Sequence, residues 1–192
     1  MEYIVEKIGM SRTVTVPASS VTLLKVLEAK VCSVDENGVA IVSYANGKKA
    51  NAAIAGQQKK FELSAEFNRF ATMNVANKES GDIDLTPLTD ATVVSTQFKS
   101  KGRGFAGVVK RHGFHGGRGS HGHRMGRRTG SIGNAEWPGR VQKGRKMPGH
   151  LGTDTTSVKN TITSFDTESM ILVVKGSVSG ANGALGRVKV AK

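Results

Sequence analysis

Short apolar runs rich in β-branched residues alternate with turn-forming residues over much of the chain, which is the pattern of β-strands joined by tight turns. Asp35-Glu36-Asn37-Gly38 is a hairpin signal, and Asn46-Gly47 and Asp166-Thr167-Glu168-Ser169 mark further turns. The pattern predicts strands within Val21–Val34, Val39–Tyr44, Ala91–Phe98, Ser157–Phe165, Met170–Lys175 and Arg187–Val190.

One segment has helical spacing instead. In Phe61–Phe70 (FELSAEFNRF), Phe61 and Ala65 are about one helical turn apart, so a single short helix is predicted there. Many short strands with few helices are most simply accommodated in a closed barrel, because closure leaves no strand edge exposed. The predicted fold class is therefore mainly β, a β-barrel with one short helical region.

Positive charge is concentrated in one segment between the predicted strands. The chain has a net charge of +13 and a pI near 10.1, and residues 97–150 contain 13 of its 28 Lys and Arg residues but only one of its 15 acids, Glu136. The rest of the chain is close to neutral. Such a distribution predicts an anionic partner, which can be nucleic acid, an acidic membrane surface or an acidic protein.

The same segment contains 14 of the 24 glycines and few large apolar residues, so it cannot bury enough surface to offset the entropy of ordering it. We expect a polyanion to order it, since glycine lets the backbone pass close to a sugar-phosphate chain while Lys and Arg neutralise phosphates. An irregular extension suits the crevices of a folded RNA better than a regular duplex groove. Structured RNA is the favoured partner, and a general nucleic-acid-binding or RNA-chaperone protein is the alternative.

The compartment follows from what the chain lacks. Cys32 is the only cysteine, so no internal disulfide is possible, and a reducing compartment is expected. The apolar neighbours of Cys32 predict that its side chain is small and buried and is not a reactive thiol. Glu2 and Glu6 are unlike a signal peptide, and no apolar run approaches the roughly 18 residues of a membrane helix. We expect a soluble, cytoplasmic protein with no membrane partner.

Gly102–Gly107 (GRGFAG) matches the GxGxxG spacing of dinucleotide-binding loops and follows a predicted strand. The residues after it, VVKRHGFHGG, have no helical pattern, and the next acid, Glu136, stands too far on to hold a ribose hydroxyl. A glycine-rich segment produces this spacing by chance. We therefore predict no cofactor and no small-molecule substrate.

The histidines suggest a metal site only at first sight. They have no Cys, Asp or Glu among them, and the neighbouring arginines repel a cation, so hydrogen bonding or stacking on nucleic acid is favoured and no metal is predicted. Ser120 and His121 can be drawn into a catalytic triad, but no nucleophile-elbow spacing is present, and we predict no enzyme. The five histidines, all in the basic segment, are His112, His115, His121, His123 and His150.

Trp137, the only tryptophan, precedes Pro138-Gly139, which forces a turn. The ring either packs beneath that turn or stacks on a base or wedges into folded RNA. The sequence favours neither interpretation.

Three stretches of the basic segment resemble the signature of one protein family: Lys99–Lys110 (KSKGRGFAGVVK), Gly126–Gly133 (GRRTGSIG) and Pro138–Gly152 (PGRVQKGRKMPGHLG). Lys7–Arg12 (KIGMSR) resembles the family's opening and Leu172–Val178 (LVVKGSV) a stretch near its end. On these motifs, which cover nearly the whole chain, the sequence is similar to the bacterial family of large-ribosomal-subunit proteins known as L-three.

The resemblance implies a barrel of the type shared with translation factors, formed by residues 1–96 and 153–192, with residues 97–152 as an rRNA-penetrating extension inserted in it. It also implies that the barrel lies on the solvent side of the large subunit and that the extension runs through 23S rRNA towards the peptidyl transferase centre. An early role in assembly, near the 3′ part of that RNA, is implied too. The expected partners are 23S rRNA and the neighbouring ribosomal proteins fourteen and nineteen of the large subunit, with no homo-oligomer.

The basic residues of the extension are expected to contact rRNA. The positions that match the family are Lys99, Lys101, Lys110, Arg127, Arg140, Lys143, Arg145 and Lys146, and the charge of the segment adds Arg103, Arg111, Arg118, Arg124 and Arg128.

Asn134, Glu136 and Trp137 correspond to the tip of the family's extension, nearest the peptidyl transferase centre. Many members have glutamine, methylated in some of them, where this chain has Glu136, and a glutamate cannot take that amide modification. The histidine-rich residues between Arg111 and Arg124 also depart from the family.

Overall fold

The computed structural model describes residues 1–47, 51–77 and 79–190, and the chain divides into two compact units. One unit comprises Met1–Lys99 together with Thr155–Lys192, and the other comprises Ser100–Asp154. Among the described residues, no helix is both long enough and apolar enough to cross a membrane.

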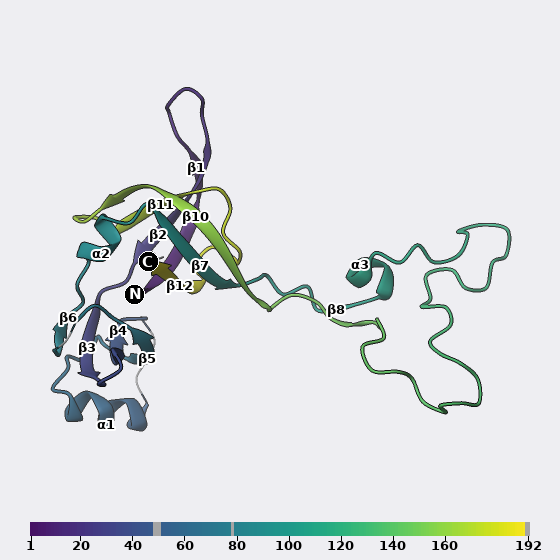
Figure 1. Ribbon diagram of the computed structural model, residues 1–192, viewed down its shortest axis with the longest axis horizontal. Coiled ribbons are helices and arrows are strands. Elements are labelled where there is room, and N and C mark those ends of the chain that lie inside the picture. The colour runs from purple at the N-terminus through teal and green to yellow at the C-terminus, as the bar shows by residue number, and fades with distance from the viewer. Residues whose placement is uncertain (48–50, 78, 191–192) are drawn as a thin grey trace. The chain divides into compact units, whose positions relative to one another are not determined.

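The first unit is built on a closed barrel of six antiparallel strands (Figure 1). Around the barrel the strands follow in the order β1, β12, β7, β10, β11, β2, which confirms the predicted mainly β fold with a barrel. Their bounds are β1 Glu2–Arg12, β2 Ser20–Val26, β7 Val93–Lys99, β10 Thr155–Asp166, β11 Ile171–Lys175 and β12 Leu185–Val190.

Alternation along the strands fills the barrel interior. In β7, Val94, Thr96 and Phe98 are buried, while the residues between them are exposed or half-buried. Gly186 of β12 pairs with Phe98, and a Cβ atom on that glycine would lie 2.5 Å from Cδ1 of the ring, so the ring occupies the space of the missing side chain. Burial of each Val, Leu or Phe side chain stabilises the folded protein by about 1.5–3 kcal/mol relative to leaving that side chain in water. The buried members of this core are Tyr3, Val5, Leu24, Val26, Leu88, Val94, Phe98, Leu172, Val174, Val178 and Val188.

A second, four-stranded sheet belongs to the same unit and has the strand order β5, β4, β3, β6. Its strands are β3 Ala29–Val34, β4 Val39–Tyr44, β5 Arg69–Asn74 and β6 Gly81–Asp82. Ile4 of the barrel strand β1 packs into the core of this sheet together with Val31, Val42 and Met73. The predicted strand region Val21–Val34 is thus two strands, β2 in the barrel and β3 in the second sheet.

The helix predicted at Phe61–Phe70 is wrong in position. The helix of this region, α1, spans Ala52–Lys60 and begins at Asn51, whose side-chain oxygen accepts a hydrogen bond from the backbone N–H of Ile54 at 2.9 Å. The helix ends at Phe61, and Glu62 has a positive φ of 51°. The spacing of the phenylalanines arises from a turn followed by strand β5, and the Phe61 and Phe70 rings meet with their centroids 6.4 Å apart.

A shorter helix, α2 (Thr86–Thr89), follows a loop that is tied to β1. The Tyr3 hydroxyl donates a hydrogen bond to the backbone carbonyl of Asp84 at 2.9 Å, and the side chain of Leu88 in α2 is fully buried. Burial, with a smaller effect from the Asp84 carboxylate, raises the pKa of Tyr3 to about 12.

Two predicted turns are confirmed. At Asp35–Gly38 the N–H of Gly38 donates to the Asp35 carbonyl at 2.9 Å. At Asp166 the side chain accepts hydrogen bonds from the Ser169 hydroxyl and from the Glu168 N–H, which hold the pKa of Asp166 below its ordinary value. The turn predicted at Asn46-Gly47 runs into residues 48–50, which lie outside the described residues.

Cys32 is half-buried, so the prediction of a buried thiol is wrong. The pairing of β3 with β4 shifts register between Val31 and Ser33, which leaves Cys32 as the extra residue of a β-bulge. A bulge interrupts the alternation of inward and outward side chains, and for this reason apolar neighbours in the sequence did not predict burial.

Candidate nucleic-acid interface

The second unit, Ser100–Asp154, is a long loop with little regular structure. Among its described residues the buried hydrophobic ones are Ala106 and Val108, so side-chain hydrogen bonds and glycine turns, more than an apolar core, determine its path. Its three short elements are β8 (Phe105–Ala106), α3 (Val108–His112) and β9 (Gly149–His150), and β8 pairs antiparallel with β9.

Arg111 joins the outgoing and returning arms of this loop. Its guanidinium Nη1 donates a hydrogen bond to the backbone carbonyl of Met147 at 2.7 Å, and Nε2 of His112 lies 3.0 Å from the same oxygen. Both residues come from α3, which ends at Gly113. The two contacts hold α3 against a segment more than thirty residues further along the chain.

A close backbone approach makes glycine necessary at Gly116. The neighbouring N–H of Gly117 donates to the Gly126 carbonyl at 2.7 Å and closes a loop. A Cβ atom on Gly116 would lie 2.4 Å from that same carbonyl oxygen, and the φ angle of Gly116 is +71°. Any other residue would force the loop open, so here glycine serves a close approach inside the extension itself.

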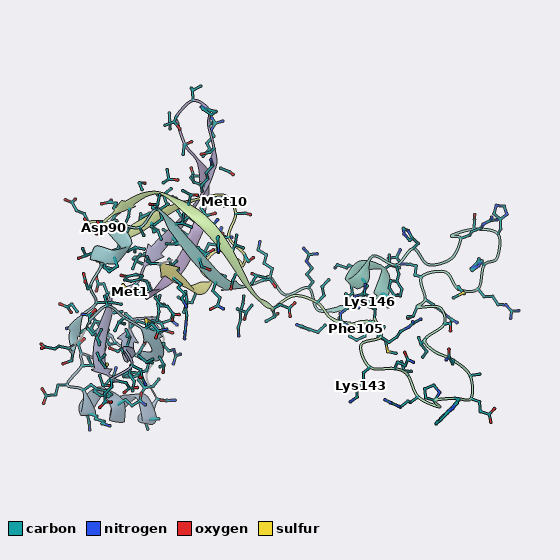
Figure 2. The ribbon with its side chains drawn as sticks, in the orientation of Figure 1. Met1, Met10, Asp90, Phe105, Lys143 and Lys146 are labelled. Atoms are coloured by element: carbon teal, nitrogen blue, oxygen red, sulfur yellow. The ribbon has the colours of Figure 1, made fainter. Side chains whose placement is uncertain are left out.

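None of the 13 predicted rRNA-binding cations is fully buried: twelve of them are exposed, and Arg111 is half-buried. Two of them, Arg111 and Arg145, donate hydrogen bonds to backbone carbonyls of the loop. Within the part of the chain that the structure describes, the ion pairs all lie in the first unit, so none of these cations is neutralised by a carboxylate. Figure 2 shows the side chains, with Lys143 and Lys146 labelled on the returning arm. Uncompensated like charges repel one another, and an anionic partner relieves that repulsion.

Three of the arginines converge on one hollow. Arg124, Arg127 and Arg128 line an open cavity of about 590 Å³ whose other walls include apolar residues. These apolar residues were not predicted to be part of the site, although apolar side chains in an otherwise polar, glycine-rich stretch were the available signal. They are Val108, Met125, Ile132 and Pro148.

The predicted tip residues Asn134, Glu136 and Trp137 are all exposed. The Trp137 side chain is 85% exposed, so the interpretation that it packs beneath the turn is wrong, and a ring available for stacking is what the structure contains. The Trp137–Pro138 peptide bond is cis. Near the tip, the Arg145 guanidinium donates to the Ser131 carbonyl and joins the two sides of the loop.

The GxGxxG spacing at Gly102–Gly107 does not form a dinucleotide-binding loop. Phe105 and Ala106 of the motif belong to strand β8, so the glycines do not make the tight turn between a strand and a long helix that such a loop needs. A helix does follow, contrary to the prediction, but α3 has only five residues and carries Lys110, Arg111 and His112 in its last turn.

The histidines do not gather into a ligand set. In the described part of the chain, no group of three or more His, Cys, Asp or Glu side chains is placed to hold a metal ion. The His112 ring instead lies beside Phe114, with centroids 6.1 Å apart.

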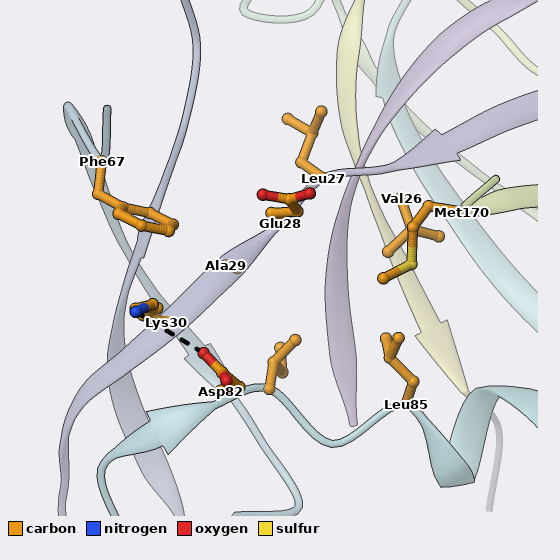
Figure 3. Close-up of a pocket in the computed structure, with 10 residues that line it drawn as sticks. Val26, Leu27, Glu28, Ala29, Lys30, Phe67, Asp82, Leu85 and Met170 are labelled. Atoms are coloured by element: carbon orange, nitrogen blue, oxygen red, sulfur yellow. Dashed lines mark ion pairs between the residues drawn. The ribbon is translucent and has the colours of Figure 1, made fainter. Parts of the chain in front are cut away.

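A pocket of about 510 Å³ in the first unit contains charged groups (Figure 3). Lys30 lies 3.9 Å from Asp82 and places its ammonium 5.4 Å from the centroid of the Phe67 ring. These side chains satisfy one another, and the remaining walls are largely apolar, including Leu27 and Met170. An exposed pair of this kind is worth little energetically and supplies no activated nucleophile.

The closed barrel and the uncompensated cationic loop define a mainly β protein whose extension is suited to a polyanionic partner. No protein-family model matches the chain. It is 62% identical over 192 residues to large ribosomal subunit protein uL3 of Wolinella succinogenes, with all of both chains covered, and 60% identical over the same length to that of Campylobacter jejuni, again with all of both chains covered. Identity to the uL3 protein of Thermotoga maritima is 36% over 196 residues, covering 97% of this chain and 95% of the relative.

The chain therefore belongs to the uL3 family of large ribosomal subunit proteins. This family is the one that the motifs in the basic segment predicted.

Proposed function

We propose that the protein is a structural, non-catalytic constituent of the large subunit of a bacterial cytoplasmic ribosome, and that its extension binds 23S rRNA. The observation that carries the proposal is the set of exposed cations without a carboxylate partner among the described residues. Membership of the uL3 family supports the same function.

The mechanism is electrostatic replacement. The cations displace counterions from converging phosphates, the glycines let the backbone approach the RNA, and strands β7 and β10 fix where the extension leaves and rejoins the barrel. RNA orders the extension, and the extension in turn holds RNA helices together. The residues assigned to this contact are Lys99, Lys101, Arg103, Lys110, Arg111, Arg118, Arg124, Arg127, Arg128, Arg140, Lys143, Arg145 and Lys146.

We assign different roles to two parts of the chain. Residues 1–96 and 153–192 form the globular domain, and residues 97–152 form the extension, which reaches towards the peptidyl transferase centre with Asn134, Glu136 and Trp137 at its tip. The protein takes part in early assembly of the subunit, beside ribosomal proteins fourteen and nineteen. The exposure of the tip residues supports their assignment to a contact.

Sedimentation of a native lysate through a sucrose gradient tests the proposal, with the protein followed by mass spectrometry before and after a high-salt wash. Co-migration with the large subunit that survives the wash is the expected result. Recovery in the free or nucleoid fractions would instead indicate a general nucleic-acid-binding or RNA-chaperone protein and would overturn the proposal.

A further inference from the structure

Phe105 is the exposed aromatic residue of the ribbon that β8 and β9 form. Its side chain is 79% exposed, whereas its neighbour Ala106 is 3% exposed. Side chains alternate between the two faces of a strand, so this register buries the small residue and leaves the large aromatic one in water. A shift of the pairing by one residue would bury Phe105 and expose Ala106. The exposure of the phenyl ring is therefore fixed by the register in which β8 pairs with β9.

Backbone hydrogen bonds join the two arms of the loop next to Phe105. Arg103 N–H donates to the Leu151 carbonyl at 2.8 Å, and Leu151 N–H donates to the Gly104 carbonyl at 3.0 Å. The arms approach so closely that a Cβ atom on Gly152 would lie 2.1 Å from the Lys101 carbonyl oxygen. The ring is thus carried by a paired backbone, which reduces the entropy lost when a ligand binds to it.

His150 stands directly opposite Phe105 in the register of β8 and β9. Directly opposed residues of an antiparallel pair share one face, so the imidazole and the phenyl ring lie on the same side of the ribbon. His150 is exposed, and among the described residues no ring contacts the Phe105 ring. The ribbon therefore exposes two aromatic side chains on one face.

The charge around these rings is that of a nucleic-acid contact. Lys101, Arg103 and Lys110 are all exposed, and the sequence has no acid between Asp90 and Glu136. The carboxylate that follows His150 most closely is Asp154, at the base of the ribbon, where its backbone pairs with Ser100. An apolar ring within a cationic surface suits a base whose phosphates meet the cations, and it does not suit an apolar protein surface.

We propose that Phe105, with His150 beside it, forms a stacking platform for one unpaired nucleobase of the RNA partner. The inference rests on the proposed function and adds a ligand site to it: the cations fix the backbone of the RNA, and the ribbon selects a position where a base has left its helix. This site is separate in the sequence from the tip at Trp137.

Ultraviolet crosslinking of purified large subunits tests the site directly, because a base stacked on an aromatic ring forms a zero-length crosslink. Trypsin releases Phe105 in the peptide Gly104–Lys110, which is expected to carry a nucleotide adduct. Phe105→Leu should abolish that adduct and Phe105→Trp should retain it. The peptide Thr129–Arg140, which contains Trp137, is the internal reference, and its crosslinking should not change in either variant.

Binding of the full-length chain to a 23S rRNA transcript supplies the second readout. Phe105→Leu should weaken binding by about 5- to 100-fold, equally at every salt concentration, because stacking releases no counterions. Wild-type binding with no salt dependence would contradict the proposed function itself. Normal salt-dependent binding that Phe105→Leu leaves unchanged, with no adduct on its peptide, would overturn the stacking platform alone.

Discussion

Lys99 and Thr155 are paired residues of the barrel, at the end of β7 and the beginning of β10. The whole of the second unit, Ser100–Asp154, lies between these two neighbouring positions, and the backbone N–H of Ser100 continues the pairing with a hydrogen bond of 2.8 Å to the Asp154 carbonyl. The barrel is therefore complete at the point where the extension begins, and the two parts can be tested separately.

Replacement of residues 101–153 by Asn-Gly, a two-residue hairpin turn, should leave a folded barrel. Less entropy is lost when the ends of a shorter loop are brought together. The free energy of unfolding should therefore equal that of the full chain or exceed it by up to about 3 kcal/mol. Urea denaturation followed by circular dichroism measures this. A variant that fails to fold would show that the extension contributes to the stability of the barrel.

Removal of two extension cations should reduce the salt dependence of RNA binding. If about eight cations reach phosphates, the affinity of the wild type falls by some three to five powers of ten between roughly 50 and 200 mM salt. Lys143→Ala with Lys146→Ala should lower the slope of log K against log salt by about 0.7–0.9 for each residue. Lys25→Ala, an exposed lysine on β2, is the control and should keep the wild-type slope. An unchanged slope in the double variant would show that these two lysines do not contact phosphates.

Trp137→Ala should impair the ribosome without destabilising the protein. The side chain is 85% exposed, so the melting temperature of the isolated chain should shift by no more than about 1–2 °C. Peptidyl transfer or antibiotic sensitivity of ribosomes carrying the variant should change, and Trp137→Phe, which keeps an aromatic ring, should change them less. Wild-type translation, drug response and subunit yield in Trp137→Ala would argue against a tip role.

Gly186→Ala should destabilise the barrel, because the added Cβ atom would lie 2.5 Å from the buried Phe98 ring. Overpacking of this kind costs about 1–3 kcal/mol. Gly56→Ala is the matched control: it lies inside α1 with open space around it, and it should stabilise the protein by up to about 1 kcal/mol. Urea denaturation of both variants should give changes of opposite sign, and equal behaviour would contradict the packing described for β7 and β12.

The raised pKa of Tyr3 predicts a loss of stability at alkaline pH. Below pH 10 the phenol is protonated in both the folded and the unfolded chain, so its contribution is fully present. Between pH 10 and about 12 the unfolded chain loses the proton first, and the wild type should lose about 2 kcal/mol relative to Tyr3→Phe, which cannot ionise. Thermal denaturation of the two proteins across this range measures the difference, and a constant difference would refute the assignment.

The strands were predictable where turn chemistry and apolar runs agree. β4 has the predicted bounds Val39–Tyr44, and the hairpin at Asp35–Gly38 precedes it as expected. β1 was not predicted, because Lys7 interrupts its apolar pattern. The structure accounts for that lysine: it is buried, and its ammonium donates to the carbonyls of Val178 at 2.6 Å and Gly180 at 3.1 Å. Partners so distant in sequence leave no local signal.

The candidate interface was likewise predictable only in the features that have a local signal in the sequence. Its charge and its cations were predictable because composition alone sets them, whereas the path of the extension depends on bonds such as that of Arg111 to the Met147 carbonyl. The exposure of Phe105 follows from the register of β8 and β9. That register could not be predicted, because a strand of two residues is too short to show a periodic pattern in the sequence. Helix α1 was missed because AAIAGQQKK has little apolar periodicity, although Asn51 was an available capping signal.

Anchorage of the extension at Lys99 and Thr155 has a topological consequence. A segment held at both ends has no free end to thread, so it can enter a passage only as a doubled chain, tip first, with both arms together. Under the proposed function, every passage in the RNA that admits the extension must therefore be wide enough for two arms at once. That width is imposed by the connectivity of the chain and does not depend on affinity.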